Sequence, residues 1–438
     1  MNQHESPIVR IFQKSNAQNP TAKILLIILL VVILLFPHAK VMELVNERHD
    51  RSKEVETEIM QKWAGAQTIT GPSIIVPVTV GQDLRVYQLF ATQQNLQLDN
   101  KTELRKRGIF ETPIYTTECK VISEFNIDAL SRELPQNSTI HLDRLEVIQV
   151  IDDIKGIHGE INFLLNGELQ NIESGLGRAS HKKRNGFHFS IDQELSGIAI
   201  VEGHFNLRGS KSLGIRPMGE TTSIKMKSDW AHPSFQGTFL PGERDITGQG
   251  FNASWTINKL QHKMNLVESQ ITFPDSSIQV GFISPINVYS QVNRISKYAI
   301  LFLCFTFTAV FIFEALFKVN VHPVQYFLTG AASIIFYVFL LSLSEHIPFL
   351  WAYTAAASLL TVLISFYVMW VFESKVLAAC MAAIKTCMYG FLYTTIQIED
   401  YALLIGSTGV LLVLAGLMIF TRNLNKAPVP PPVPASAA

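Results

Sequence analysis

Apolar residues divide the chain into three parts. One unbroken apolar run, Ile24–Phe36, lies near the N-terminus, and a long polar stretch follows it. Five apolar segments then follow one another from Tyr298 to Thr421. A helix needs about 20 apolar residues to cross the hydrocarbon core of a bilayer. The pattern therefore predicts a C-terminal bundle of five transmembrane helices, at residues 298–317, 324–343, 348–372, 376–396 and 401–421.

The N-terminal run is shorter than the others, and it also fits the core of a signal peptide. We favour an uncleaved anchor, because a long leader (1–23) precedes the run and the site after it, at Pro37, Ala39 and their neighbours, matches a cleavage signal poorly. The helix can lengthen to residues 24–43 if Lys23 and Lys40 extend toward water at its ends. We expect one N-terminal transmembrane helix.

The charges next to the apolar segments predict an orientation. The basic residues of the termini and short connections fall on one side of the membrane: Arg10, Lys14, Lys23, Lys318, Lys375, Arg422 and Lys426. The alternate short loops carry only acidic residues: Glu345, Glu399 and Asp400. Because basic loops stay in the cytoplasm, both termini are expected inside and the polar middle outside, in the bacterial periplasm. The Pro-rich tail, 422–438, should be disordered and cytoplasmic.

The polar middle of the chain begins with a helical pattern of charged residues and continues with the period-two pattern of strands. Glu47 and Arg51 are spaced for a helical ion pair, so residues 44–70 are expected to form a helical stalk. From Gly71 to Ser296, short runs alternate polar and apolar residues with period two, and turn residues separate them. This predicts a large all-β domain, a sandwich or an open barrel, although the pattern does not give the strand order.

The composition indicates a membrane protein and gives no sign of a nucleic-acid-binding one. Hydrophobic residues make up 48% and charged residues 16%, against about 25% charged residues in typical soluble proteins. Lys+Arg and Asp+Glu are equal at 36 each, so nothing indicates a nucleic-acid partner. Cys119 is the lone cysteine of the polar domain, which therefore has no internal disulfide and depends on its hydrophobic core.

Two ionisable residues inside predicted membrane helices are candidate functional residues, because charge is costly in hydrocarbon. Lys385 lies near mid-bilayer and Glu314 near the cytoplasmic end of its helix. They could pair with each other or line a path for a proton or solute. A depth difference of roughly 10 Å favours the alternative, in which Glu314 pairs with Lys318 and Lys385 faces helix carbonyls or snorkels.

A second candidate is a loop in the β domain that combines aromatic residues, histidine and proline. Its members are Trp230, His232, Pro233 and Phe235. Such a rigid loop could be a binding edge. It could equally be a buried corner that closes the sandwich, which we favour slightly.

Motifs of enzymes are missing from the sequence. It contains no HExxH, CxxC or G-x-S-x-G pattern and no Gly-rich phosphate loop. We therefore expect no catalytic residues, no metal site and no cofactor.

Several stretches, spread in order over nearly the whole chain, carry a resemblance to a known family. They are residues 71–78, 230–241, 296–301, 313–316, 322–326, 343–346 and 402–406 with 421–423. On these stretches the chain resembles the inner-membrane protein CreD family. The resemblance implies a role in cell-envelope integrity, linked to an envelope-stress regulon and colicin tolerance. It implies no established enzymatic activity.

The favoured function is a non-enzymatic inner-membrane protein that supports envelope integrity or the envelope-stress response. Its periplasmic β domain would bind an envelope protein or cell-wall partner, while the helices contact membrane lipids. Two membrane tethers would raise the domain's effective concentration for partners at the membrane surface. The alternative is a transporter or flippase that uses the five-helix module, and a hydrolase of envelope components ranks last.

Overall fold

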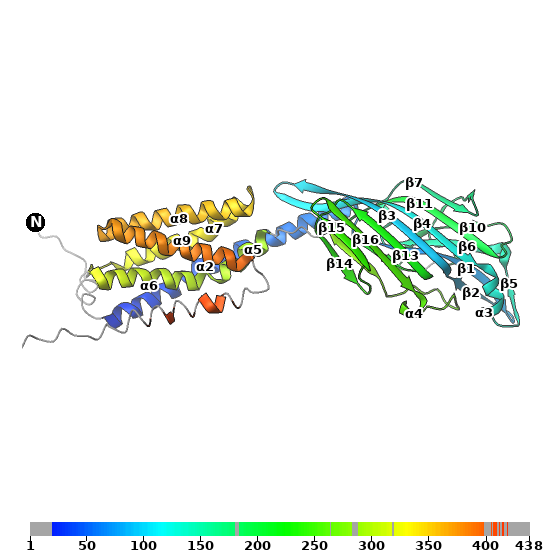
Figure 1. The fold of residues 1–438 in the computed structure, drawn as a ribbon, viewed down its shortest axis with the longest axis horizontal. Coiled ribbons are helices and arrows are strands. Elements are labelled where there is room, and N and C mark those ends of the chain that lie inside the picture. The colour runs from blue at the N-terminus through cyan, green and yellow to red at the C-terminus, as the bar shows by residue number, and fades with distance from the viewer. Residues whose placement is uncertain are drawn as a thin grey trace, which may run out of the picture. The chain divides into compact units, whose positions relative to one another are not determined.

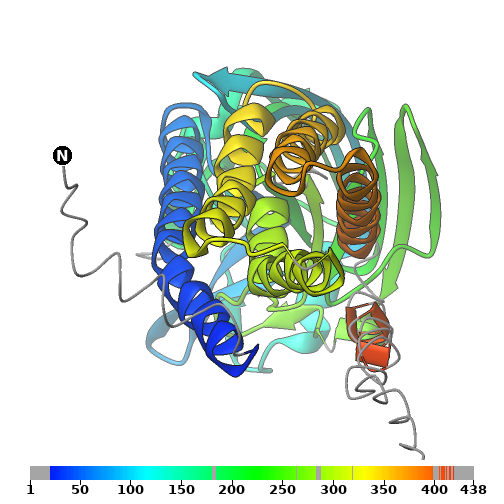
Figure 2. The ribbon, with the colours of Figure 1, turned by 90° about the vertical axis from the view of Figure 1, so that its left-hand side faces the viewer.

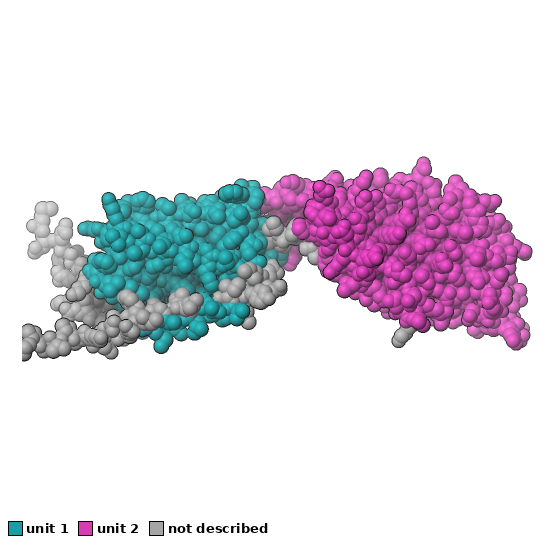
Figure 3. All heavy atoms as spheres, viewed as in Figure 1, with its two compact units in different colours: residues 1–50, 287–438 teal, residues 51–286 magenta. Residues whose placement is uncertain are grey.

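The structure, a computed structural model, describes residues 20–179, 184–262, 264–282, 288–317 and 319–397, together with 404, 406–409, 411, 414–415 and 418. The chain forms two compact units (Figure 3). Unit 1 contains residues 1–50 and 287–438, and unit 2 contains residues 51–286.

Unit 1 is helical. It holds the first part of α2 (Pro20–Trp63), α5 (Val288–Lys297), α6 (Ala299–Phe317), α7 (Pro323–Ser344), α8 (Phe349–Phe372) and α9 (Lys375–Gln397). Among the described residues, α2 and α6 to α9 are long and apolar enough to cross a membrane. Most of the predicted span 401–421 lies outside the described residues. The N-terminal apolar helix and the C-terminal group of apolar helices match the prediction from the sequence.

The helices of unit 1 pack closely, and Figure 2 shows them nearly end-on. Neighbours in sequence from α6 to α9 are also neighbours in space. Gly330 on α7 leaves room for Leu34 of α2 and Phe307 of α6, which a side chain at this position would displace. His38 of α2 packs edge-on against Tyr337 of α7, with ring centroids 6.0 Å apart. The N-terminal helix is therefore part of the bundle.

Side chains at the helix ends fit membrane interfaces. Trp351 and Trp370, near the two ends of α8, are 66% and 71% exposed. They are separated along the helix by roughly 28 Å, close to the thickness of a hydrocarbon core. Tryptophan prefers the boundary between headgroups and acyl chains. These two rings indicate that α8 spans the bilayer almost from end to end.

Unit 2 consists of two β-sheets, and Figure 1 labels many of their strands. The eight-stranded sheet has the order β15-β16-β13-β3-β4-β11-β7-β8. Its strands are β3 (Ala91–Arg107), β4 (Phe110–Asn126), β7 (Ile157–Leu165), β8 (Glu168–Leu169), β11 (Ile198–Ser210), β13 (Gly219–Ser228), β15 (Glu243–Thr247) and β16 (Gly250–Asn258). The long hairpin β3–β4 forms its centre, and β13 pairs with β3 in parallel.

The ten-stranded sheet has the main order β14-β18-β12-β1-β6-β10-β9. In addition, β2 and β5 pair with β1, and β17 pairs with β2. Its strands are β1 (Gln67–Val80), β2 (Asp83–Leu89), β5 (Ser138–Ile140), β6 (Leu145–Ile151), β9 (Glu173–Ser174), β10 (Asn185–Ile191), β12 (Ser212–Arg216), β14 (Pro233–Gly237), β17 (Val267–Glu268) and β18 (Ile278–Phe282). Short helices connect the strands: α3 (Leu130–Glu133), α4 (Lys259–His262) and 3₁₀ turns at Ile127–Ala129, Leu142–Arg144, Ile154–Gly156 and Gly177–Ala179.

The first strand starts earlier than the sequence pattern indicates. β1 begins at Gln67, and Gly71 and Pro72 lie within it at a bulge between Thr70 and Ser73. Proline has no N–H for the ladder, so it is tolerated at a bulge. A side chain at Gly71 would collide with the amide of Gln94. The Gly-Pro pair thus bends the strand instead of marking where the β domain begins.

One hydrophobic core lies between the two sheets. It is built from the inward-facing residues of both, including a cluster of phenylalanines: Phe163, Phe187, Phe189 and Phe205. Buried and exposed residues alternate along β11 and β13, so one face of the eight-stranded sheet is buried and the other is open. The β-sandwich prediction is confirmed.

Candidate functional site

Glu314 belongs to a buried polar cluster that joins three helices of unit 1. Lys23 of α2 forms an ion pair with its carboxylate. Tyr326 of α7 donates a hydrogen bond of 2.8 Å to the second carboxylate oxygen, and the Val321 backbone N–H donates one of 3.2 Å to the first. Lys23 also donates to the Asn320 side chain at 3.1 Å. The charges and polar groups of this cluster largely satisfy one another, so the contacts of the cluster hold the three helices together.

Lys385 lies in a different place. Its side chain on α9 is buried, and the ammonium group donates to the hydroxyls of Thr306 on α6 at 2.7 Å and Ser333 on α7 at 3.2 Å. Both hydroxyls donate their own hydrogen to backbone carbonyls one turn earlier, of Phe302 and Thr329. Their lone pairs are therefore free to accept from Lys385.

The two intramembrane candidates are thus not brought together. Among the residues that the structure describes, Lys385 has no carboxylate partner, and the cation beside Glu314 is Lys23. Lys318, the alternative partner considered for Glu314, lies outside the described residues. Sequence reasoning missed Lys23 because it lies 291 positions from Glu314.

A second polar cluster in unit 1 surrounds Glu345, directly after α7. The Tyr289 hydroxyl donates to Glu345 at 3.2 Å, and the Arg48 guanidinium of α2 lies 4.0 Å from the same oxygen. Burial and the nearby Glu345 carboxylate raise the pKa of Tyr289, which keeps the phenol protonated as a donor. Lys23 and Arg48 are roughly 37 Å apart along α2, which is comparable to a bilayer with its interfacial regions.

The candidate loop of the β domain is part of the sandwich wall. The Trp230 indole donates to the His232 carbonyl at 3.1 Å, and Pro233 is the first residue of β14. Phe235 packs edge-on against Phe251 and its ring lies 5.9 Å from that of Trp255. Trp230 and Phe235 are half-buried against the core, and His232 is exposed. These contacts fit a corner that closes the sandwich.

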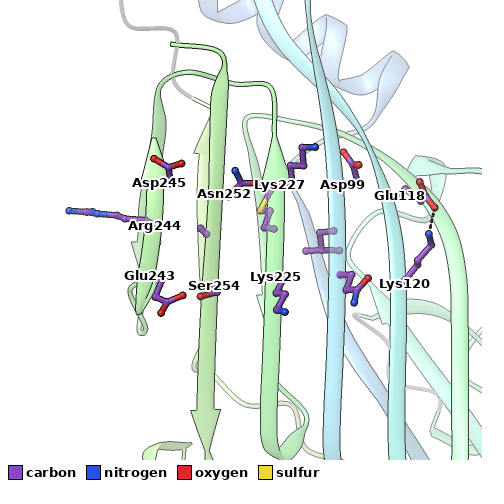
Figure 4. A pocket seen from close by; sticks show the side chains of 14 residues that line it. Asp99, Glu118, Lys120, Lys225, Lys227, Glu243, Arg244, Asp245, Asn252 and Ser254 are labelled. Atoms are coloured by element: carbon purple, nitrogen blue, oxygen red, sulfur yellow. Dashed lines mark ion pairs between the residues drawn. The ribbon is translucent and has the colours of Figure 1, made fainter. Parts of the chain in front are cut away.

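A groove that the sequence analysis did not identify lies on the open face of the eight-stranded sheet (Figure 4). It has a volume of about 680 Å³ and crosses β15, β16, β13, β3 and β4. Its charged and polar lining residues are Gln97, Asp99, Glu118, Lys120, Lys225, Lys227, Glu243, Arg244, Asp245, Asn252 and Ser254. Four of these are acidic and four are basic, but the side chain of Arg244 points away from the other lining side chains (Figure 4). The open face therefore carries four acidic and three basic residues.

Strand register sorts the charges into columns. Ser254 of β16 is paired with Glu243 on one side and with Lys225 on the other. One row further, Asn252 is paired with Asp245 and Lys227 in the same way. Figure 4 shows the resulting order: carboxylates on β15, neutral side chains on β16 and ammonium groups on β13. Neighbouring strands are about 4.8 Å apart, so the acidic and basic columns are separated by roughly 10 Å.

Lys225 and Lys227 form the basic column on β13, and on β3 their register partners are Gln97 and Asp99. In the described part of the chain, no carboxylate lies within ion-pair distance of Lys225 or Lys227. Further along the groove, Lys120 donates a hydrogen bond of 2.9 Å to Glu118. This hydrogen bond is the main cause that lowers the pKa of Glu118. His204 also contacts Glu118, at 3.1 Å. A period-two pattern of Lys, Ser, Thr and Asn on β13 and β16 was the available sequence signal, but only the strand order brings these residues together.

The groove has the chemistry of a binding surface. Its exposed groups offer charge and hydrogen bonds, and its apolar members Leu98, Met226 and Ala253 are buried beneath them. No group of three or more metal-ligating side chains occurs among the residues that are described. The arrangement suits a partner that carries both positive and negative groups.

Comparisons with known proteins identify the family. The family model of the inner membrane protein CreD matches residues 19–427. The inner membrane protein CreD of Escherichia coli (strain K12) is 29% identical over 416 residues, which cover 90% of this chain and 91% of that protein.

Solved structures show weaker likeness. An M1 zinc metallopeptidase mutant from Deinococcus radiodurans, bound to a tripeptide substrate, has a TM-score of 0.24 at 9% identity and covers 48% of this chain. The corresponding peptidase without the mutation has a TM-score of 0.23 at 7% identity. The chain spans 53% of the length of each. Family model and relative agree over nearly the whole sequence, and the chain belongs to the CreD family of multi-pass inner membrane proteins.

Proposed function

We propose that this protein supports the integrity of the bacterial cell envelope by binding an envelope partner through its β domain, on the periplasmic side of the inner membrane. The observation that carries the proposal is the groove, whose Lys225 and Lys227 lack carboxylate partners within the described chain. Unpaired charges that line a concave surface are available to a partner. The role is binding, and the proposal includes no catalytic step.

The attachment of the β domain supports this role. The chain enters the domain from α2 and leaves it toward α5, so membrane helices precede and follow the sandwich. A domain held at both ends stays near the membrane, which raises its effective concentration for partners there. A modest affinity in the groove is then sufficient for binding.

The periplasmic placement follows from charge. Lys23 and Lys375 flank membrane helices at the ends predicted to be cytoplasmic, whereas Glu345 lies in a short connection at the opposite end. An Asn162→Cys variant tests the placement, because Asn162 is exposed on the β domain and lies outside the groove. In intact cells we expect it to react with a membrane-impermeant maleimide. Reaction only after the cells are opened would overturn the placement.

A charge reversal tests the role of the groove. Cells whose only copy is the K225E/K227E variant should leak a periplasmic marker enzyme under detergent stress, at an unchanged protein level. A matched control is R132E/K155E, which makes the same charge change at exposed positions outside the groove. If both variants protect cells as well as the wild-type chain does, the groove has no role in envelope integrity.

A second candidate function is a transporter or flippase, and the specific observation that favours it is Lys385. Among the described residues this buried cation contacts two hydroxyls and the ring of Tyr389, whose centroid is 5.8 Å away, and has no carboxylate partner. Such a cation marks a place where a polar solute could enter the helix module. Purified protein in liposomes should then move a labelled lipid or solute, and K385M should abolish the movement. Absence of movement by the wild-type protein would discard this candidate.

A further inference from the structure

We propose that the partner of the groove is a second copy of this chain, whose groove docks face to face on the first. This inference depends on the proposed role of the groove in partner binding, and it names the partner. The argument uses the order of charges across β15, β16 and β13.

The groove is complementary to itself. Carboxylates of Glu243 and Asp245 lie on one side of β16, and ammonium groups of Lys225 and Lys227 lie on the other, in matching rows. A half-turn about an axis along β16 places β15 of one copy over β13 of the other. Glu243 then faces Lys225 of the second copy, and Asp245 faces its Lys227. By symmetry the same two pairs form a second time.

The residues on the axis are compatible with this contact. Asn252 and Ser254 of β16 would meet the same residues of the second copy. Amide and hydroxyl groups can both donate and accept hydrogen bonds, so identical side chains can pair across a twofold axis. A ring of like charges at this position would repel its own copy, but the structure has neutral groups here.

The overall charge of the groove favours the same partner. With four acidic and three basic residues on the open face, the groove is nearly neutral and has little net attraction for a polyanion or a polycation. Separated columns of opposite sign do attract a surface with the reverse order, and a second copy presents that order. Aromatic platforms for a sugar or a base are missing from its lining.

The contact should be weak in solution and effective in a membrane. Three strands form a small interface, and exposed ion pairs contribute little individually. Two copies in one bilayer meet at a much higher effective concentration than free proteins. Two copies anchored in one bilayer can be related only by a twofold axis along the membrane normal, so this contact requires β16 to lie along that normal.

Cysteine crosslinking of the full chain in native membranes tests the geometry. The background replaces three native cysteines by serine, Cys304, Cys380 and Cys387, and keeps buried Cys119. In this background Asn252→Cys should give a covalent dimer with a short bis-maleimide. Asn162→Cys is the control, because Asn162 is exposed on β7 of the same sheet and lies roughly 24 Å from the axis. It should give no dimer.

Charge exchange tests the chemistry. In the Asn252→Cys background, E243K/D245K and K225E/K227E should each lower self-crosslinking about tenfold, because each replaces four surface attractions by repulsions. Co-expressed with different tags, the two variants should crosslink to each other at least as well as wild-type copies do. Equal self-crosslinking of both variants and the wild-type chain would overturn the inference, as would a failure of the mixed pair at normal protein levels.

The envelope readout separates failure of the inference from failure of the proposed function. If co-expression restores both the mixed crosslink and protection of the envelope, a second copy is the partner. If wild-type copies do not crosslink but K225E/K227E still loses protection, the groove binds another molecule and the inference is wrong. If K225E/K227E retains full protection but loses self-crosslinking, two copies dock through the groove without an envelope role, and only the proposed function fails. If K225E/K227E retains both protection and self-crosslinking, both proposals fail.

Discussion

Lys23 on the N-terminal helix and Glu314 on α6 form a buried ion pair, with side chains 9% and 11% exposed. This pair, 291 positions apart in sequence, fastens α2 to the C-terminal helices. Tyr326 and the Val321 N–H hold the same carboxylate, so Glu314 connects three helices. The N-terminal helix is consequently a structural member of the bundle as well as an anchor.

Breaking this pair on one side should destabilise unit 1. Lys23→Met leaves the buried carboxylate without its cation, and Glu314→Leu leaves the cation without its carboxylate. Each should cost about 3–5 kcal/mol, because an uncompensated charge remains buried. Thermal unfolding of the purified protein in detergent measures the loss. The double variant K23M/E314L should recover much of the lost stability. Equal losses in single and double variants would show that the Lys23–Glu314 pair does not hold the helices together.

The exposed pair Lys40–Glu43 on the same helix is the control. Its side chains are 62% and 68% exposed, and they are 2.6 Å apart. Exposed pairs contribute about 0–1 kcal/mol. Lys40→Met should therefore leave the unfolding temperature nearly unchanged. A loss as large as that of Lys23→Met would show that burial is not the cause.

The hydroxyls around Lys385 should matter only while the lysine is present. In T306V/S333A the buried ammonium group loses both acceptors, at a cost of about 1–3 kcal/mol for each unsatisfied group. In the Lys385→Met background the same two changes should leave stability nearly unchanged, because no buried ammonium group then needs the hydroxyls as acceptors. A double-mutant cycle from thermal unfolding measures this coupling. Additive effects would show that the contacts contribute nothing.

Adjacent residues of β11 should differ sharply in their contribution to the sandwich. Phe205 is 1% exposed and its ring lies 6.3 Å from that of Phe163, whereas His204 is exposed on the open face. Phe205→Ala should lower the free energy of unfolding by about 3–5 kcal/mol through the cavity that it leaves. His204→Ala should change it by no more than about 0.5 kcal/mol. Denaturant unfolding followed by tryptophan fluorescence compares the two.

The buried thiol of Cys119 should make stability depend on alkaline pH. Burial, with a smaller effect of Glu118, raises the pKa of Cys119. In the unfolded chain the thiol ionises near its ordinary pKa of about 8.5. Above that pH the unfolded state holds fewer protons than the folded state, so stability falls as pH rises. Between pH 8 and 10 the wild-type domain should lose stability relative to Cys119→Ala, and parallel curves would contradict this assignment.

The architecture could be predicted because each part of the chain has its own pattern of apolar residues. Apolar segments of membrane length indicate helices, and alternation along β11 and β13 indicates strands with one buried face. These are local properties. The sequence pattern predicts that the β domain starts at Gly71, four residues after β1 begins, because Gly-Pro is typical of an end of local structure. The sheet accommodates this pair as a bulge.

The sites were less accessible from sequence because they depend on distant partners. The sequence shows that Glu314 and Lys385 are unusual in membrane helices, but it suggests as partners for Glu314 only Lys385 or the near neighbour Lys318. Lys23, Thr306 and Ser333 come from other helices. The groove requires β13 to lie parallel to β3 and between β3 and β16, an order that no repeat in the sequence encodes.

The first and last strands of the β domain lie in one sheet, separated only by β12. β1 follows α2 and pairs with β12 in parallel, and β12 pairs with β18, the last strand before α5. A mechanical load that pulls the two anchors apart would therefore travel through two strand ladders and bypass the eight-stranded sheet. The surface that carries the groove would keep its shape while the two membrane anchors are pulled apart.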